Sequence, residues 1–107
     1  MNEERIKLLQ SYMAEEPDNP FNAYALAMEY FDHAPEKAAK LLMGLTEQHP
    51  EYLPTYYKAA TLFWELEDIP NARSLFEKGI ALAKMQKNEK ALGELNAAYL
   101  NFQFEEE

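Results

Sequence analysis

The chain has 107 residues, of which 48% are hydrophobic and 13% are aromatic, and it contains only 3 glycines. This composition excludes a disordered or fibrous chain and suits one globular domain, because a chain of this length can bury a single core. The 19 acidic and 10 basic residues give a formal charge of -9, which repels nucleic-acid phosphates and anionic lipid headgroups.

The first predicted helix covers residues 3–15. Leu9 and Pro17 match Leu42 and Pro50, which follow 33 residues later. We therefore expect the first helix to be half of a repeat, equivalent to a second helix that lacks its first.

Four further helices are predicted at residues 20–32, 35–48, 53–66 and 69–86, and each has a proline in its first turn. Proline suits that position because its φ angle is already helical and its missing N–H has no partner there anyway. Asn19 and Asp68 are predicted N-caps, since their side-chain oxygens accept hydrogen bonds from unpaired amides. No segment has the alternation typical of a strand.

The last predicted helix covers residues 89–102. It contains Leu92-Gly93, a pair typical of the repeat, but has Asn96 where the repeat would place an aromatic residue. We interpret this segment as a terminal capping helix, because the end units of repeat arrays are usually atypical. The following Glu105, Glu106 and Glu107 are predicted to be a charged, solvated tail.

Small and bulky residues recur together at one period along the middle of the chain. In the second helices of the two repeats the offset is 34 residues, and in the first helices it is 33. The recurring residues are Ala38 and Leu42 as Ala72 and Phe76, and Tyr24, Ala27 and Tyr30 as Tyr57, Ala60 and Phe63.

This pattern resembles the tetratricopeptide repeat family, whose signature is Trp-x2-Leu-Gly-x2-Tyr, then Ala-x3-Phe, then Pro. The resemblance covers about residues 4–84 and departs from the signature in lacking its tryptophan and in having Lys84 at the closing proline. It implies an all-α fold, a right-handed α-solenoid of antiparallel helix pairs, as one domain over residues 1–107. Repeat 1 is expected at 20–50 and repeat 2 at 53–86. The matching residues are Ala23, Leu26, Ala27, Tyr30, Ala38, Leu42 and Pro50, and Tyr56, Ala59, Ala60, Phe63, Ala72 and Phe76.

A second apolar stripe, about 120° from the predicted core face, runs along each first helix. Core burial alone does not explain it. The resemblance implies that first helices line a concave inner surface, where the stripe would form a groove for an apolar peptide or helix of a partner protein. The alternatives are self-association as a homodimer through the same face, and cover by the chain's own first or last helix. The candidate binding residues are Phe21, Tyr24, Met28, Phe31, Tyr57, Thr61 and Trp64.

The family's best-known variant holds a partner's terminal carboxylate with Lys, Arg and Asn on the inner surface. In this chain Lys58 is the only cation near the corresponding positions, so the sequence predicts no such clamp. Acidic residues at the rim, Asp32, Glu29 and Glu65, are expected to favour partners with basic flanks.

No catalytic or metal site is predicted, and no cofactor is expected. Cysteine is absent, His33 and His49 flank one predicted helix, and Gly44, Gly79 and Gly93 lie inside helices rather than in a phosphate-binding loop. The chain opens with acidic residues instead of a basic leader, and no apolar run approaches the roughly 18 residues of a membrane span. We therefore expect a non-enzymatic, cytoplasmic protein that binds neither nucleic acid nor membrane.

Overall fold

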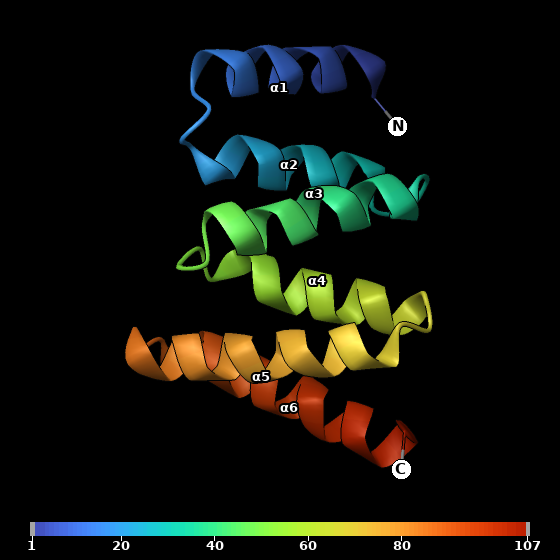
Figure 1. The fold of residues 1–107 in the computed structure, drawn as a ribbon, viewed down its shortest axis with the longest axis vertical. Coiled ribbons are helices and arrows are strands. Elements are labelled where there is room, and N and C mark those ends of the chain that lie inside the picture. Colours follow the sequence, from blue (N-terminus) through green and yellow to red (C-terminus); the bar gives the residue numbers. More distant parts are fainter. Residues whose placement is uncertain (1, 107) are drawn as a thin grey trace. The chain divides into compact units, whose positions relative to one another are not determined.

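A computed structural model describes residues 2–106, and this part of the chain contains six α-helices and no strand. The prediction of an all-α protein is confirmed. Figure 1 shows the helices in chain order. Their bounds are α1 (Glu3–Glu15), α2 (Pro20–Tyr30), α3 (Pro35–Gln48), α4 (Pro54–Glu65), α5 (Ile69–Met85) and α6 (Glu89–Glu106).

Five of the six helices described begin at the residue that the sequence predicts, and α4 begins one residue later, at Pro54 instead of residue 53. A proline occupies the first turn of α2, α3 and α5, and α4 itself begins at Pro54. The Asn19 side chain accepts a hydrogen bond from the Phe21 amide, and the Asp68 side chain accepts one from the Asn71 amide. Both predicted N-caps are confirmed.

Two helix ends share one geometry. Glu16, after α1, has φ −130° and ψ 67°, and His49, after α3, has φ −134° and ψ 65°. Each precedes a proline, which disfavours the helical conformation for the residue before it. Because the two positions are 33 residues apart, α1 ends as the second helix of repeat 1 does.

Four predicted ends differ from the structure, two of them by a single residue, since α4 ends at Glu65 and α5 at Met85. The helix expected to end at residue 32 ends at Tyr30, since Ala34 leaves the helical region before Pro35 and its amide donates to the Tyr30 carbonyl. The helix expected to end at residue 102 continues to Glu106, so Glu105 and Glu106 belong to the helix, and both are exposed as the prediction of a solvated end requires. Glu107 lies outside the described residues.

The chain divides into two compact units, the first ending at Thr55 and the second beginning at Tyr56. In the first unit α2 packs against both α1 and α3 (Figure 1). Ile6, Leu9, Ala25 and Leu26 form a buried cluster in this unit. Partly buried Met13, Tyr30 and Leu41 pack against the cluster.

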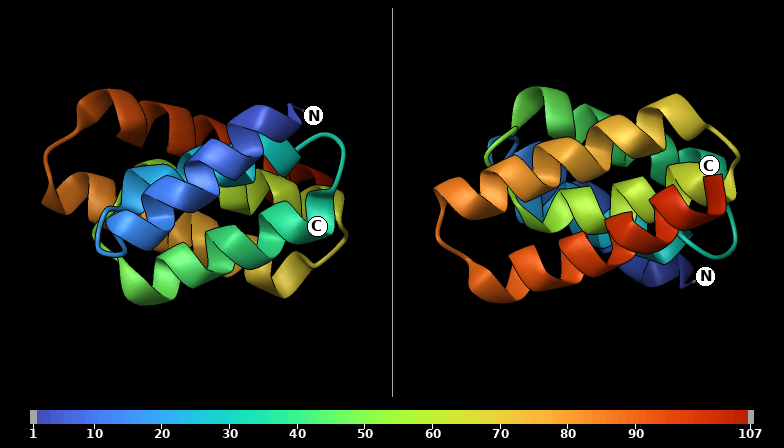
Figure 2. Two further views of the ribbon diagram at one scale, coloured as in Figure 1. Left: turned by 90° about the horizontal axis from the view of Figure 1, so that it is seen from above. Right: turned by 90° about the horizontal axis from the view of Figure 1, so that it is seen from below.

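In the second unit α5 and α6 run antiparallel and pack against each other (Figure 2). Phe76 and Phe102 are fully buried, with their ring centroids 5.3 Å apart. The predicted small positions Ala59, Ala60 and Ala72 have no solvent exposure, which lets neighbouring helices approach closely.

None of the helices described here combines the length and the apolar character that crossing a membrane requires.

Candidate functional site

The predicted binding residues of the first unit lie on one side of α2. Their spacing of three, four and three residues puts Phe21, Tyr24, Met28 and Phe31 on a single helical face. Phe21 is 57% exposed, and the other three side chains are half-buried. This face therefore presents apolar surface to solvent, mainly at its N-terminal end.

Tyr24 is held by the segment that connects α3 to α4. Its ring meets the ring of Tyr52 edge-on, with centroids 6.0 Å apart. Burial, and secondarily the neighbouring Tyr52 phenol, raise the pKa of Tyr24, and burial raises the pKa of Tyr52 as well. Both phenols therefore stay neutral well above physiological pH, and Tyr24 acts as an apolar surface with a polar edge.

The predicted residues of the second unit lie on α4. Tyr57 is 40% exposed. The Thr61 hydroxyl lies 3.0 Å from the carbonyl oxygen of Tyr57 and 3.1 Å from that of Lys58, so it is satisfied within its own helix. Thr61 thus adds no strong polar group to this face.

Trp64 is engaged within the second unit. Its ring stands edge-on to Phe102 of α6, with centroids 5.3 Å apart, and its indole N–H donates to the Glu106 carboxylate at 2.8 Å. The sequence left open that the chain's own last helix covers the apolar stripe, and the contacts of Trp64 with α6 agree with that alternative at this position. Of the seven predicted residues, Phe21 and Tyr57 are the most exposed.

One predicted rim acid is also engaged. The Arg5 side chain of α1 contacts the Glu29 carboxylate of α2 at 2.6 Å, so Glu29 already has a cationic partner. Asp32 and Glu65 are exposed.

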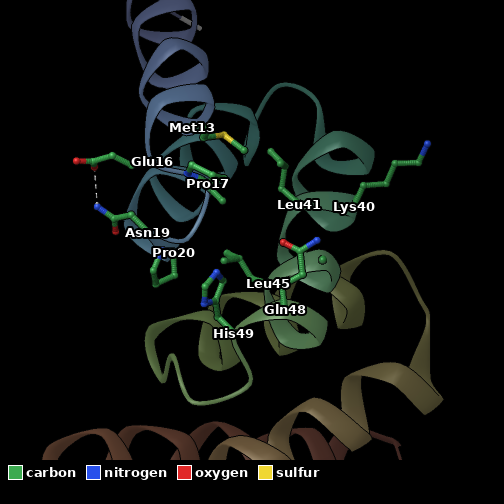
Figure 3. A pocket seen from close by; sticks show the side chains of 12 residues that line it. Met13, Glu16, Pro17, Asn19, Pro20, Lys40, Leu41, Leu45, Gln48 and His49 are labelled. Carbon is green, nitrogen blue, oxygen red and sulfur yellow. Dashed lines mark hydrogen bonds between the residues drawn. The ribbon is translucent and has the colours of Figure 1, made fainter.

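The first unit also contains a cleft that the sequence did not predict. It has a volume of about 340 Å³ and lies between the end of α1, the start of α2 and one side of α3 (Figure 3). Met13, Pro17 and Leu45 contribute apolar surface, and Gln48 and His49 contribute polar groups at its margin. The volume is at the lower end for ligand sites, and none of the seven predicted residues lines the cleft.

A signal for this cleft does exist in the sequence. Pro17 and Pro20 bracket the turn between α1 and α2, and Gly44 on α3 faces open space, since a Cβ added there would meet no other atom within 4 Å. The missing side chain at Gly44 leaves room beside the proline-rich turn. Recognising this requires knowing that α3 lies opposite that turn, which the repeat period alone does not state.

Within residues 2–106 no three histidine or acidic side chains come together closely enough to hold a metal ion. His33 is exposed, and His49 lies with its Nδ1 atom 3.7 Å from the Glu51 carboxylate.

We compared the chain with protein families, curated proteins and solved structures. No model of a protein family matches the chain, and no curated protein matches it significantly. Among solved structures, the crystal structure of a tetratricopeptide repeat domain protein from Salinibacter ruber is 34% identical, with a TM-score of 0.76, over 79% of this chain and 97% of the other.

A solution NMR structure of a tetratricopeptide repeat domain protein from the same organism gives the same result. It is 34% identical, with a TM-score of 0.75, over 80% of this chain and 88% of the other. Identity at this level over almost the whole neighbour, together with six helices that follow the predicted repeat, shows more than a shared fold. The chain belongs to the tetratricopeptide repeat family, an all-α class of helical-repeat solenoids.

Proposed function

We propose that this chain binds an apolar peptide or short helix of another protein through the aromatic faces of α2 and α4, without catalysing a reaction. As a member of the tetratricopeptide repeat family the chain is a protein–protein interaction module in the general sense. The proposal adds which side chains make the contact. We also propose that the helices form a right-handed superhelix and that these faces line its concave groove.

The observation that carries the proposal is the exposure of large aromatic side chains on the first helices of both repeats. Phe21 on α2 is 57% exposed and Tyr57 on α4 is 40% exposed, while core positions on the same helices, Leu26 and Tyr56, are 4% and 3% exposed. Aromatic rings bury much apolar area at low conformational cost, which is why they dominate binding hot spots.

The acidic surface favours partners with basic flanks. Asp32 and Glu65 are exposed, and the whole chain carries a formal charge of -9. Electrostatic attraction of this kind accelerates association and weakens with salt, whereas the aromatic contacts set the lifetime of the complex.

The test is site-specific photo-crosslinking in cells. A photoreactive phenylalanine analogue is placed at Phe21 or at Tyr57, and as a matched control at Leu8 of α1, which is 50% exposed. We expect the same partner to be captured from the two aromatic faces and not from Leu8. Capture from Leu8 alone would contradict the proposal.

A peptide of the captured segment is then titrated while the fluorescence of Trp64, the single tryptophan, is recorded. The substitutions Phe21→Ser and Tyr57→Ser should each weaken binding about 10-fold or more, the loss typical of a hot-spot aromatic side chain. Trp64 itself is left unchanged, because its contacts with Phe102 and Glu106 make it part of the fold.

A further inference from the structure

The outer face of α6 has an apolar seam that none of the contacts described above uses. We define the α6 seam as Gly93, Ala97, Leu100 and Phe104, all of which are exposed. Leu100 is 66% exposed and Phe104 is 85% exposed, more than either aromatic residue on α2 or α4. Large apolar side chains that are this exposed and share one helical face are typical of interaction surfaces.

The seam lies on the side of α6 opposite its packed face. At 100° per residue the four seam residues fall within a narrow arc, and the buried residues Leu95 and Phe102 lie about 180° away. The spacing of four, three and four residues is that of a coiled-coil seam. This pattern therefore suits docking against another helix and not packing inside the chain.

We propose that the α6 seam binds the α6 seam of a second copy of this chain, with the two helices antiparallel about a twofold axis. The spacing is the same when read in either direction, so an antiparallel pair brings Phe104 against Gly93 of the second copy and Leu100 against its Ala97. Each bulky side chain then meets a small residue, and every contact occurs twice. This self-complementarity is what a twofold interface requires.

Two chains of formal charge -9 repel each other at long range. The residues that flank the seam add no local repulsion to this. In the antiparallel arrangement each flank of the seam meets the same flank of the second copy, so Glu94 faces Asn101, whose side-chain N–H can donate to the carboxylate, and Asn96 faces Gln103. No like charges are opposed along these flanks.

The ends of the pair are complementary in charge as well. Lys87 precedes α6 and Lys90 lies in its first turn with Glu89, while the C-terminal end of α6 carries Glu105 and Glu106. An antiparallel pair places the acidic end of one helix near the basic end of the other, where the helix dipole also favours negative charge. A parallel pair would oppose the acidic ends.

The dimer is expected to be weak, because two 18-residue helices bury less area than a standard interface does. In sedimentation equilibrium the average mass should rise with protein concentration, from 12.4 kDa in dilute solution toward twice that value. Leu100→Glu should lower the association constant at least tenfold without changing the thermal midpoint, because this side chain is largely exposed. Leu8→Glu, at an exposed position of α1, is the matched control and should change nothing.

Orientation is tested with cysteines, since the chain has none of its own. Equal amounts of Gly93→Cys and Phe104→Cys variants are mixed and oxidised. The antiparallel pair predicts mixed disulfides between the two variants, because identical positions would lie roughly 16 Å apart along the axis at 1.5 Å per residue. Predominant self-linking of Phe104→Cys would overturn the antiparallel arrangement.

This inference stands apart from the proposed partner binding on α2 and α4. A mass of 12.4 kDa at every concentration overturns the α6 dimer and leaves partner binding unaffected. Dissociation by Tyr57→Ser instead of Leu100→Glu would place the dimer on α4 and overturn the α6 seam. Loss of partner capture in Leu100→Glu, with the mass unchanged, would show that another protein occupies the seam.

Discussion

At the scale of single residues, Gly79 permits a close approach of α4 and α6 to α5 in the second unit. A Cβ atom built at this position would lie 2.7 Å from the Tyr56 Cβ atom of α4 and 3.2 Å from the Leu95 Cδ2 atom of α6. The Tyr56 Cβ atom is attached directly to the backbone, so it cannot move aside without moving its helix. Glycine at 79 is therefore a packing requirement and not a conformational one, since its helix is regular there.

We predict that Gly79→Ala destabilises the protein although alanine is the better helix former. Overpacking costs roughly 1–3 kcal/mol, and the gain in helix propensity offsets up to about 1 kcal/mol of this. Gly44→Ala is the matched control, because nothing lies within 4 Å of the added Cβ atom, and it should stabilise by up to about 1 kcal/mol. Urea denaturation measures both, and a shift of the same sign in the two variants would contradict this explanation.

At the scale of elements, the ends of α4 and α5 use one two-residue device. Glu67 and Lys87 adopt the left-handed conformation, with φ 62° and φ 57°. The next residues, Asp68 and Asn88, donate their amides back to Phe63 and Ala83 and accept with their side chains from the following helix. In each turn the left-handed residue ends one helix and the residue after it caps the next, so the two residues together define a sharp turn.

Replacing Glu67 with glycine should stabilise this turn. A left-handed L-residue costs about 1–2 kcal/mol, and glycine avoids this cost while losing part of the gain to the entropy of the unfolded chain. A net gain of about 0.5–1 kcal/mol is expected, which raises the melting temperature by several degrees. Glu65→Gly, in the last turn of α4, supplies the comparison and should destabilise by up to about 1 kcal/mol. A lower melting temperature for Glu67→Gly would show that the strain is relieved in another way.

The sequence predicts those features of the helices that depend on neighbouring residues, and it misses those that depend on residues far apart in the chain. Prolines, the caps at Asn19 and Asp68 and the repeat period are local, and they predict all six helices. The left-handed turns are missed because Glu67 and Lys87 are not the glycines that usually mark them. The extension of α6 to Glu106 brings the Glu106 carboxylate to the Trp64 indole, and local signals do not predict a contact between residues so distant in sequence.

For the candidate site, too, some features follow from local spacing and others depend on contacts between distant residues. Helical spacing predicts that Phe21, Tyr24, Met28 and Phe31 share one face of α2 and of the residue that follows it. Spacing does not reveal that Tyr52 covers part of Tyr24, or that Phe102 covers part of Trp64, because both contacts join residues of different elements. Periodicity predicts the direction of a side chain, and only tertiary packing decides how much of it stays exposed.

At the scale of the whole molecule, the ionisation of tyrosines links stability to pH. The pKa values of Tyr24, Tyr52 and Tyr99 are all raised, in each case chiefly by burial, and for Tyr99 also by its hydrogen bond to Glu77. The fold thus binds these three phenolic protons more tightly than the unfolded chain does. Their ionisation would also add negative charge to a chain that already carries -9.

The expected outcome is a loss of stability in alkali. Because each folded pKa lies above the ordinary value of 10.0, the stabilising contribution is complete below that pH and is lost as the pH rises through the folded pKa. The free energy of unfolding in urea should therefore be flat toward pH 9 and fall above pH 10. Phenolate absorbance followed on the native protein should show these tyrosines titrating late.

Tyr52→Phe isolates one contributor to this pH dependence. The ring contact with Tyr24 can persist in this variant, so stability at pH 7 should change little. The slope above pH 10 should become shallower, both because one phenol is gone and because Tyr24 no longer has a second phenol beside it that raises its pKa. If the variant matched the wild type at pH 7 and also kept the full alkaline slope, the loss of stability would have to come from the general repulsion of a highly negative chain. That repulsion is weakened by salt, whereas the cost of ionising a buried phenol is screened much less, so repeating the series in 1 M salt separates the two causes.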